Sequence, residues 1–177
     1  GKSIFEGSLL GKVLGFTTRI INPDRLLDKF TGKEGLFANS PFDDRTRLII
    51  SKSKNPLGIL IDKNLKQVDE VFVPILTSDD IFLIDYAQKL MNNNDSKVTI
   101  IDINNIIINN FVMENSIYAL LKKYPNNFSV LEEKAMNSSF FTKQDLMMVG
   151  LESWKNLVDS QHSWLSKVPS TLIIKHN

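Results

Sequence analysis

The sequence predicts an α/β protein in which one parallel sheet carries helices on both faces. Short segments rich in Val, Ile and Leu alternate with amphipathic segments from residue 71 onward. Alternation of strands with helices of about 10–15 residues indicates βαβ units, and the strands of such units are parallel. Apolar residues make up 42% of the 177 residues, so the chain can bury both faces of this sheet.

Residues 1–55 differ from the rest of the chain and are expected to form a helical N-terminal extension or connector. Apolar side chains recur at helical spacing over residues 9–21, which predicts one amphipathic helix. Asn22 then supplies an N-cap, and Pro23 occupies the first position of a second helix. Residues 31–45 are rich in turn-forming residues and are expected to form a loop.

Residues 56–177 are expected to carry the sheet, after a short strand in the apolar run at residues 57–62. Residues 71–76 are apolar on both faces, as in a central parallel strand, and Pro74 is tolerated near the end of that strand. The five strands of the sheet are expected at residues 71–76, 98–103, 128–131, 146–150 and 171–174. The helices between them are expected at residues 77–91, 113–124, 140–143 and 154–168.

Composition and motifs exclude several classes of function. Cysteine is absent, which excludes disulfide scaffolds, zinc ribbons and thiol nucleophiles. The formal charge is +1 and no basic stripe is present, so no nucleic-acid partner is expected. His162 and His176 lack the acidic neighbours of a metal site, and no Gly-x-Ser-x-Gly elbow occurs. We therefore expect no catalytic residues, no metal and no cofactor.

Three segments carry a resemblance to a known family. Residues 73–79 (Val-Pro followed by Ser-Asp), residues 145–150 (ending in Gly150) and residues 168–175 resemble the first, fourth and closing strand regions of the universal stress proteins. The resemblance implies a three-layer, doubly wound parallel sheet of five strands in the order 3-2-1-4-5.

A second resemblance concerns the segment before the sheet. Residues 56–63 (Pro-Leu-Gly-Ile-Leu-Ile-Asp-Lys), followed by residues 71–74, are similar to the cytosolic tails of bacterial and plant monovalent cation/proton antiporters. This resemblance implies that the membrane transporter domain of the same polypeptide is a partner, and that the chain lies at the cytoplasmic face of a bacterial inner membrane. The chain lacks an initiator Met, and we interpret it as a piece of a longer protein.

The nucleotide site of the stress-protein family is degenerate here. Nucleotide-binding members place an Asp at the end of the first strand, where this chain has Leu76. Of the glycine signature after the fourth strand, Gly150 is kept, but Ser153, Ser163 and Trp164 replace the second glycine, the third glycine and the hydroxyl residue. A β-carbon at a former glycine disfavours positive φ and close backbone approach. The usual mode of nucleotide binding is therefore expected to be lost.

A candidate ligand crevice follows from the expected strand order, because doubly wound sheets bind ligands where the order reverses. Asp79 and Asp80 are expected to be helix N-caps, and together with Glu152 they give the crevice an acidic rim that disfavours phosphates. Any small-molecule ligand is therefore expected to be neutral or cationic. The residues expected to line the crevice are Leu76, Thr77, Ser78, Gly150, Glu152 and Ser153.

These observations lead to one expected function and to alternatives. The expected function is a non-enzymatic regulatory or assembly domain of a cation/proton antiporter, acting as a homodimer, the commonest closed assembly. The alternative is a free-standing, nucleotide-binding universal stress protein with weak ATPase activity. An enzyme on a generic doubly wound scaffold is a third alternative, for which the sequence shows no catalytic constellation.

Overall fold

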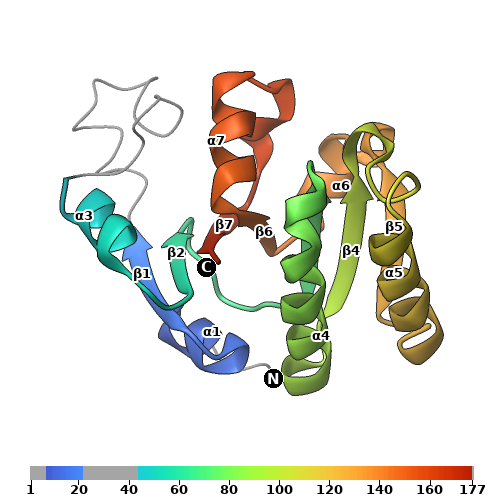
Figure 1. Ribbon diagram of the computed structural model, residues 1–177, viewed down its shortest axis with the longest axis horizontal. Coiled ribbons are helices and arrows are strands. Elements are labelled where there is room, and N and C mark those ends of the chain that lie inside the picture. The colour runs from blue at the N-terminus through green and yellow to red at the C-terminus, as the bar shows by residue number, and fades with distance from the viewer. Residues whose placement is uncertain (1–6, 22–43, 177) are drawn as a thin grey trace.

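One seven-stranded sheet organises the molecule (Figure 1). The computed structural model describes residues 7–21 and 44–176. The strand order is β1-β2-β7-β6-β3-β4-β5. The strands are β1 (Thr17–Ile21), β2 (Leu57–Ile61), β3 (Glu70–Ile75), β4 (Lys97–Asp102), β5 (Phe128–Glu132), β6 (Leu146–Gly150) and β7 (Ser170–Lys175).

The sheet is mixed, because β2 runs antiparallel to β7 and parallel to β1. The other neighbouring strands pair in parallel. The expected order 3-2-1-4-5 is present as β5-β4-β3-β6-β7, and β2 and β1 extend the sheet beyond β7. The α/β class is thus confirmed, whereas the prediction of a five-stranded, wholly parallel sheet was wrong. The strand expected at residues 57–62 exists, but it joins the sheet instead of preceding it.

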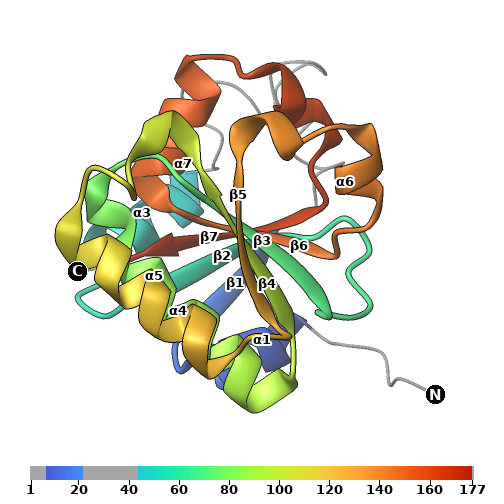
Figure 2. The same cartoon turned by 90° about the vertical axis from the view of Figure 1, so that its right-hand side faces the viewer.

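Helices cover both faces of the sheet (Figure 2). The α-helices are α1 (Gly7–Leu14), α3 (Asp44–Lys52), α4 (Phe82–Asn94), α5 (Phe111–Lys123), α6 (Ser138–Thr142) and α7 (Leu151–Asp159). Short 3-10 segments are η1 (Ser78–Ile81), η2 (Ile103–Asn105), η3 (Glu133–Ala135) and η4 (Ser163–Lys167). Among the described residues, no helix is long and apolar enough to cross a membrane.

Two apolar cores lie on opposite faces of the sheet. Successive side chains of a strand point to opposite faces, so Val71 and Val73 enter the core beneath α1, α4 and α5. Phe72, between them, enters the core beneath α6 and α7, where it lies among Phe141 and Trp154. Residues 71–76, which were expected to be apolar on both faces, form β3, and the residues of β3 after Glu70 are buried.

The N-terminal extension is not wholly helical, so the prediction of one helix over residues 9–21 was wrong. Helix α1 ends at Leu14, Gly15 adopts a positive φ of 83°, and β1 follows. Strand β1 is mostly Thr and Ile, whose β-branched side chains favour a strand, and it pairs with β2 along its whole length. The helix expected after Asn22 and most of the turn-rich segment at residues 31–45 lie outside the described residues.

The last predicted helix is interrupted. Helix α7 ends at Asp159, Gln161 has a φ of 51°, and η4 continues to Lys167. The helical spacing of apolar residues over 154–168 therefore spans a break. Residues on both sides of this break are buried in the same core, which preserves the spacing without a continuous helix.

Gly11 allows α1 to approach the turn that follows it. A β-carbon built on Gly11 would lie 2.5 Å from the backbone oxygen of Phe16. Alanine is usually favoured over glycine inside a helix by about 1 kcal/mol. Here we expect the opposite sign: Gly11→Ala should lower the free energy of unfolding by about 1–3 kcal/mol, as measured by urea denaturation. Lys12→Ala on the exposed side of α1 is the control, and a stabilising Gly11→Ala would contradict this packing.

Candidate functional site

The candidate site lies where β3 and β6 stop pairing. These strands pair only through Val71 with Leu146 and Phe72 with Met147, whereas β3 pairs with β4 along its whole length. Glu70 accepts a backbone hydrogen bond from the residue that precedes β6. Even-numbered residues of β3 therefore direct their backbone groups toward β6. Pro74 is one of them, and its missing N–H falls just beyond the last β3–β6 pair, where it costs no ladder bond.

The carboxylate of Asp80 occupies the gap between the two strand ends. Its Oδ2 accepts hydrogen bonds from the backbone N–H of Leu76 at 2.9 Å and of Thr77 at 3.1 Å. The Ser153 hydroxyl donates to the same oxygen at 2.7 Å and lies 2.9 Å from Oδ1. Asp80 is only 3% exposed. One buried carboxylate therefore ties the end of β3 to the first turn of α7.

Gly150 is required for this contact, although not because of its backbone conformation. Its φ is −72°, which any residue can adopt. A β-carbon on Gly150 would lie 2.9 Å from Oδ1 of Asp80 and 3.2 Å from the ring of Phe82. The absence of a side chain at Gly150 therefore leaves room for the Asp80 carboxylate.

Burial dominates the electrostatics of Asp80. Removal from water raises the pKa of this carboxyl, because desolvation penalises its charged form. The hydrogen bonds from Ser153, Leu76 and Thr77 lower the pKa, and the nearby charge of Asp79 raises it. The net direction is upward, so the hydrogen bonds only partly offset the cost of burial.

The structure brings together part of the predicted crevice. Leu76, Thr77, Gly150 and Ser153 surround Asp80. Ser78 and Glu152 are exposed, and Glu152 instead forms a surface ion pair with Lys155 at 3.4 Å. A role of these residues in binding a ligand stays a prediction.

Asp80 is the residue that the sequence analysis placed incorrectly. It was expected at the rim beside Asp79, but it is buried, and the exposed acidic residues there are Asp79 and Glu152. A local signal existed, because Thr77 and Asp80 have the spacing of a capping box, in which the acidic residue reaches back to the N-cap N–H. That spacing predicts the bond to Thr77, but it does not predict Ser153, which is distant in sequence.

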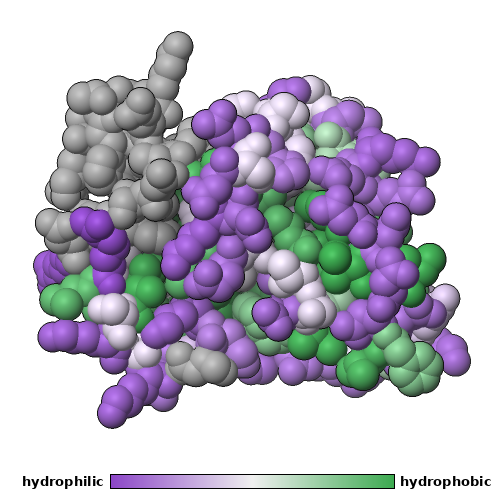
Figure 3. Space-filling view, turned by 45° about the horizontal axis from the view of Figure 1, so that its top comes forward, coloured by the Kyte–Doolittle hydropathy of each residue, from purple (hydrophilic) through white to green (hydrophobic). Residues whose placement is uncertain are grey.

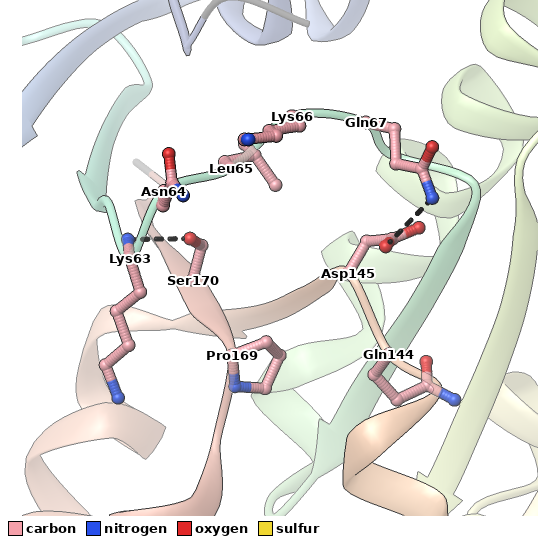
Figure 4. Close-up of a pocket in the computed structure, with 9 residues that line it drawn as sticks. All are labelled: Lys63, Asn64, Leu65, Lys66, Gln67, Gln144, Asp145, Pro169 and Ser170. Carbon is pink, nitrogen blue, oxygen red and sulfur yellow. Dashed lines mark hydrogen bonds between the residues drawn. The ribbon is translucent and has the colours of Figure 1, made fainter. Parts of the chain in front are cut away.

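A pocket of about 460 Å³ lies at the other end of the strands, beside the first residues of β6 and β7 (Figure 4). The loop after β2 arches over the first residues of β6 and β7 and forms its roof. The Lys63 backbone N–H donates to the Ser170 hydroxyl at 2.8 Å, and its ammonium donates to the Val168 carbonyl at 3.0 Å. Burial lowers the pKa of this Lys63 amine.

Asp145 fastens the other end of the same loop. Its Oδ2 accepts from the backbone N–H of Asp69 at 3.0 Å and of Glu70 at 2.9 Å, and Gln67 donates to Oδ1 at 3.4 Å. Lys63 and Asp145 thus use their polar groups to hold the loop against the sheet. Both residues therefore have a structural role, which is to hold this loop in place.

Among residues 7–21 and 44–176, no group of three or more His, Cys, Asp or Glu side chains could hold a metal ion. No protein-family model matches the chain, and a search of curated proteins finds no match.

The buried carboxylate predicts a pH-dependent term in stability. Because the pKa of Asp80 is raised in the folded state, the native protein binds this proton more tightly than the unfolded chain. Relative to Asp80→Asn, the wild-type free energy of unfolding should be greatest below the ordinary pKa of 3.8. It should fall as the pH rises through the native value. Urea denaturation from about pH 3 to pH 7 measures this difference.

Asp79→Asn is the matched control, since this neighbouring carboxyl is exposed. Subtracting each variant from the wild type removes the contribution of all other titrating groups. A difference between wild type and Asp80→Asn that is flat with pH, or that increases with it, would contradict the raised pKa.

Proposed function

We propose that this chain is a non-enzymatic regulatory or assembly domain of a monovalent cation/proton antiporter, with a nucleotide site that its own side chains occupy. The observation that carries the proposal is Asp80, which fills the crevice where a doubly wound sheet binds its ligand. A domain of this kind acts through contacts with other protein surfaces.

The chemistry of the crevice disfavours nucleotides. Phosphate binding at a strand end uses free backbone N–H groups, but those of Leu76 and Thr77 already donate to Asp80. An ionised carboxylate in this position also repels a phosphate in a poorly solvated setting. Leu76 offers no side-chain acceptor to an adenosine group. Each of these features supports a site that has lost the nucleotide function of the family it resembles.

The antiporter part of the proposal is supported by the place of the antiporter-like segment. Residues 57–61 of that segment are β2, which is buried along its whole length between β1 and β7. Lys175, at the end of β7, donates to the carbonyls of Ile50 at 2.6 Å and Ser53 at 2.7 Å, at the C-terminal end of α3. A displacement of α3 would therefore also displace β7, to which it is hydrogen-bonded.

Regulation by such a domain requires that its contacts differ between transporter states. A ligand or partner shifts a conformational equilibrium only through its differential affinity for the two states. Because α3 is hydrogen-bonded to β7 and β2 is paired with it, a difference in contacts between the two transporter states would act on the sheet through these elements. The coding sequence upstream of Gly1 offers a direct check, because the proposal requires a series of transmembrane helices of about 20 apolar residues each.

Nucleotide titration tests the filled crevice. Isothermal titration with Mg-ATP and Mg-ADP should show no binding by the wild type at concentrations up to about 1 mM. Asp80→Ala removes the carboxylate and frees the N–H groups of Leu76 and Thr77, so this variant is expected to bind more tightly than the wild type. Asp79→Ala, which leaves the crevice filled, is the control. Tight stoichiometric binding by the wild type would instead favour the free-standing nucleotide-binding stress protein.

A further inference from the structure

In the part of the chain that the structure describes, no strand pairs with the outer side of β5. It is the last strand of the sheet, and β4 pairs with its inner side. The Val98 N–H donates to the carbonyl of Asn127, so the odd-numbered residues of β5 direct their backbone groups toward β4. The N–H and C=O groups of Val130, the N–H of Glu132 and the C=O of Phe128 consequently face outward. An open edge of this kind is a template for pairing with another strand.

Exposed apolar side chains gather beside this edge (Figure 3). Phe111 is 79% exposed, Ile108 68% and Tyr118 55%, on the η2–α5 side of the strand. Leu131 of β5 is 40% exposed on the opposite face of the sheet, because it pairs with Ile101 of the core beneath α6 and α7. A groove of about 330 Å³ separates α5 from β5, and Tyr118 and Val130 are among its lining residues. An apolar patch next to an open strand edge marks an interaction surface.

The other edge strand of the sheet is β1. Strand β1 lies beside α3 (Figure 1). Arg19 of β1 donates from Nε to the hydroxyl of the buried Thr46 of α3 at 2.8 Å. Strand β7 would be an edge in a five-stranded sheet, but β2 covers it. The surface of β5 and α5 therefore combines an open strand edge with an apolar patch.

We propose that this surface binds a second copy of the chain, with the two β5 strands antiparallel about a two-fold axis through Val130. Val130 of each copy then donates its N–H to the Val130 carbonyl of the other copy. Glu132 of each copy donates its N–H to the Phe128 carbonyl of the other. The Phe128 N–H is already bonded to the Tyr124 carbonyl at 3.0 Å, so this register uses the outward groups for which residues 7–21 and 44–176 provide no backbone partner.

The charges on α5 are complementary in the same register. A two-fold axis at the edge places both α5 helices on one face of the joined sheet, antiparallel to each other. Glu114 lies four residues before Tyr118, and Lys122 lies four residues after it. An axis close to Tyr118 therefore brings Glu114 of each copy to Lys122 of the other, and the two Tyr118 rings together. A self-complementary surface is what a two-fold interface requires, which favours a second copy over an unrelated partner.

Charge reversal on the full 177-residue chain tests the register. Sedimentation equilibrium at low salt, up to about 1 mM protein, should detect the dimer. Glu114→Lys or Lys122→Glu alone places like charges opposite each other twice per dimer, so each should weaken dimerisation about tenfold. The double variant Glu114→Lys/Lys122→Glu restores opposite charges and should recover the wild-type dissociation constant. Asp159→Lys, an exposed reversal on α7, is the control and should leave that constant unchanged.

Three results would overturn this interface: a strict monomer, a dimer that neither single reversal weakens, and a double variant that is not rescued. Both charge reversals place an unfavourable charge at an end of the α5 dipole. The melting temperature of each variant shows whether this change destabilises the fold. Tyr118→Lys provides a second approach, because it places two lysines near the axis at an exposed position and should also dissociate the dimer. This inference is independent of the proposed function, since nucleotide binding at the crevice would leave β5 unchanged, and a monomer would leave Asp80 in place.

Discussion

The hydrogen-bonded carboxylate of Asp80 is the interaction on which the carboxyl edge of the sheet depends. Strands β3 and β6 pair through only two residues each and then separate, which leaves backbone N–H groups at the end of β3 without a ladder partner. Asp80 supplies the acceptor, and Ser153 links it to α7. A buried charge is tolerated when such donors surround it. Asp80 and Ser153 thereby both stabilise the fold and fill the crevice, so one set of contacts serves both roles.

Short apolar runs located the strands of the core sheet, whereas apolar periodicity failed at residues 17–21 and around residue 161. Residues 71–76 were predicted as a central strand because they are apolar on both faces, and the matching strand β3 is buried after Glu70. The edge strand β5 and the amphipathic helices α4 and α5, each buried on one side, were predicted as well. Residues 17–21 form a half-buried strand whose apolar positions also fit helical spacing after α1, and periodicity could not separate the two interpretations. The break at Gln161 carries no Gly or Pro, so the residues around η4 gave no local signal.

The candidate site shows a different limit of prediction. Asp79 and Asp80 are adjacent, chemically identical and equally suited to cap a helix. The capping-box spacing from Thr77 singles out Asp80 locally. Its burial, however, results from the approach of α7, which places Ser153 and the bare backbone of Gly150 against it. That approach is a property of the assembled sheet. The sequence could name Gly150 and Ser153 as neighbours of the crevice, but not the side chain that fills it.

The two added strands determine which surfaces remain for partners. Strand β2 enters antiparallel beside β7 and buries its edge, and β1 with α3 extends the covered side. The outward backbone groups of the core sheet are thereby left at β5. Beside it, Ile108 in the turn after η2 and Phe111 and Tyr118 of α5 are exposed apolar side chains. The segment that resembles an antiporter tail and the edge proposed for self-association are thus separated by the strands β7, β6, β3 and β4. A dimer formed through β5 would place the two β1 strands at the far ends of the joined sheet, each next to a buried β2, so pairing at one edge leaves the other edge unused.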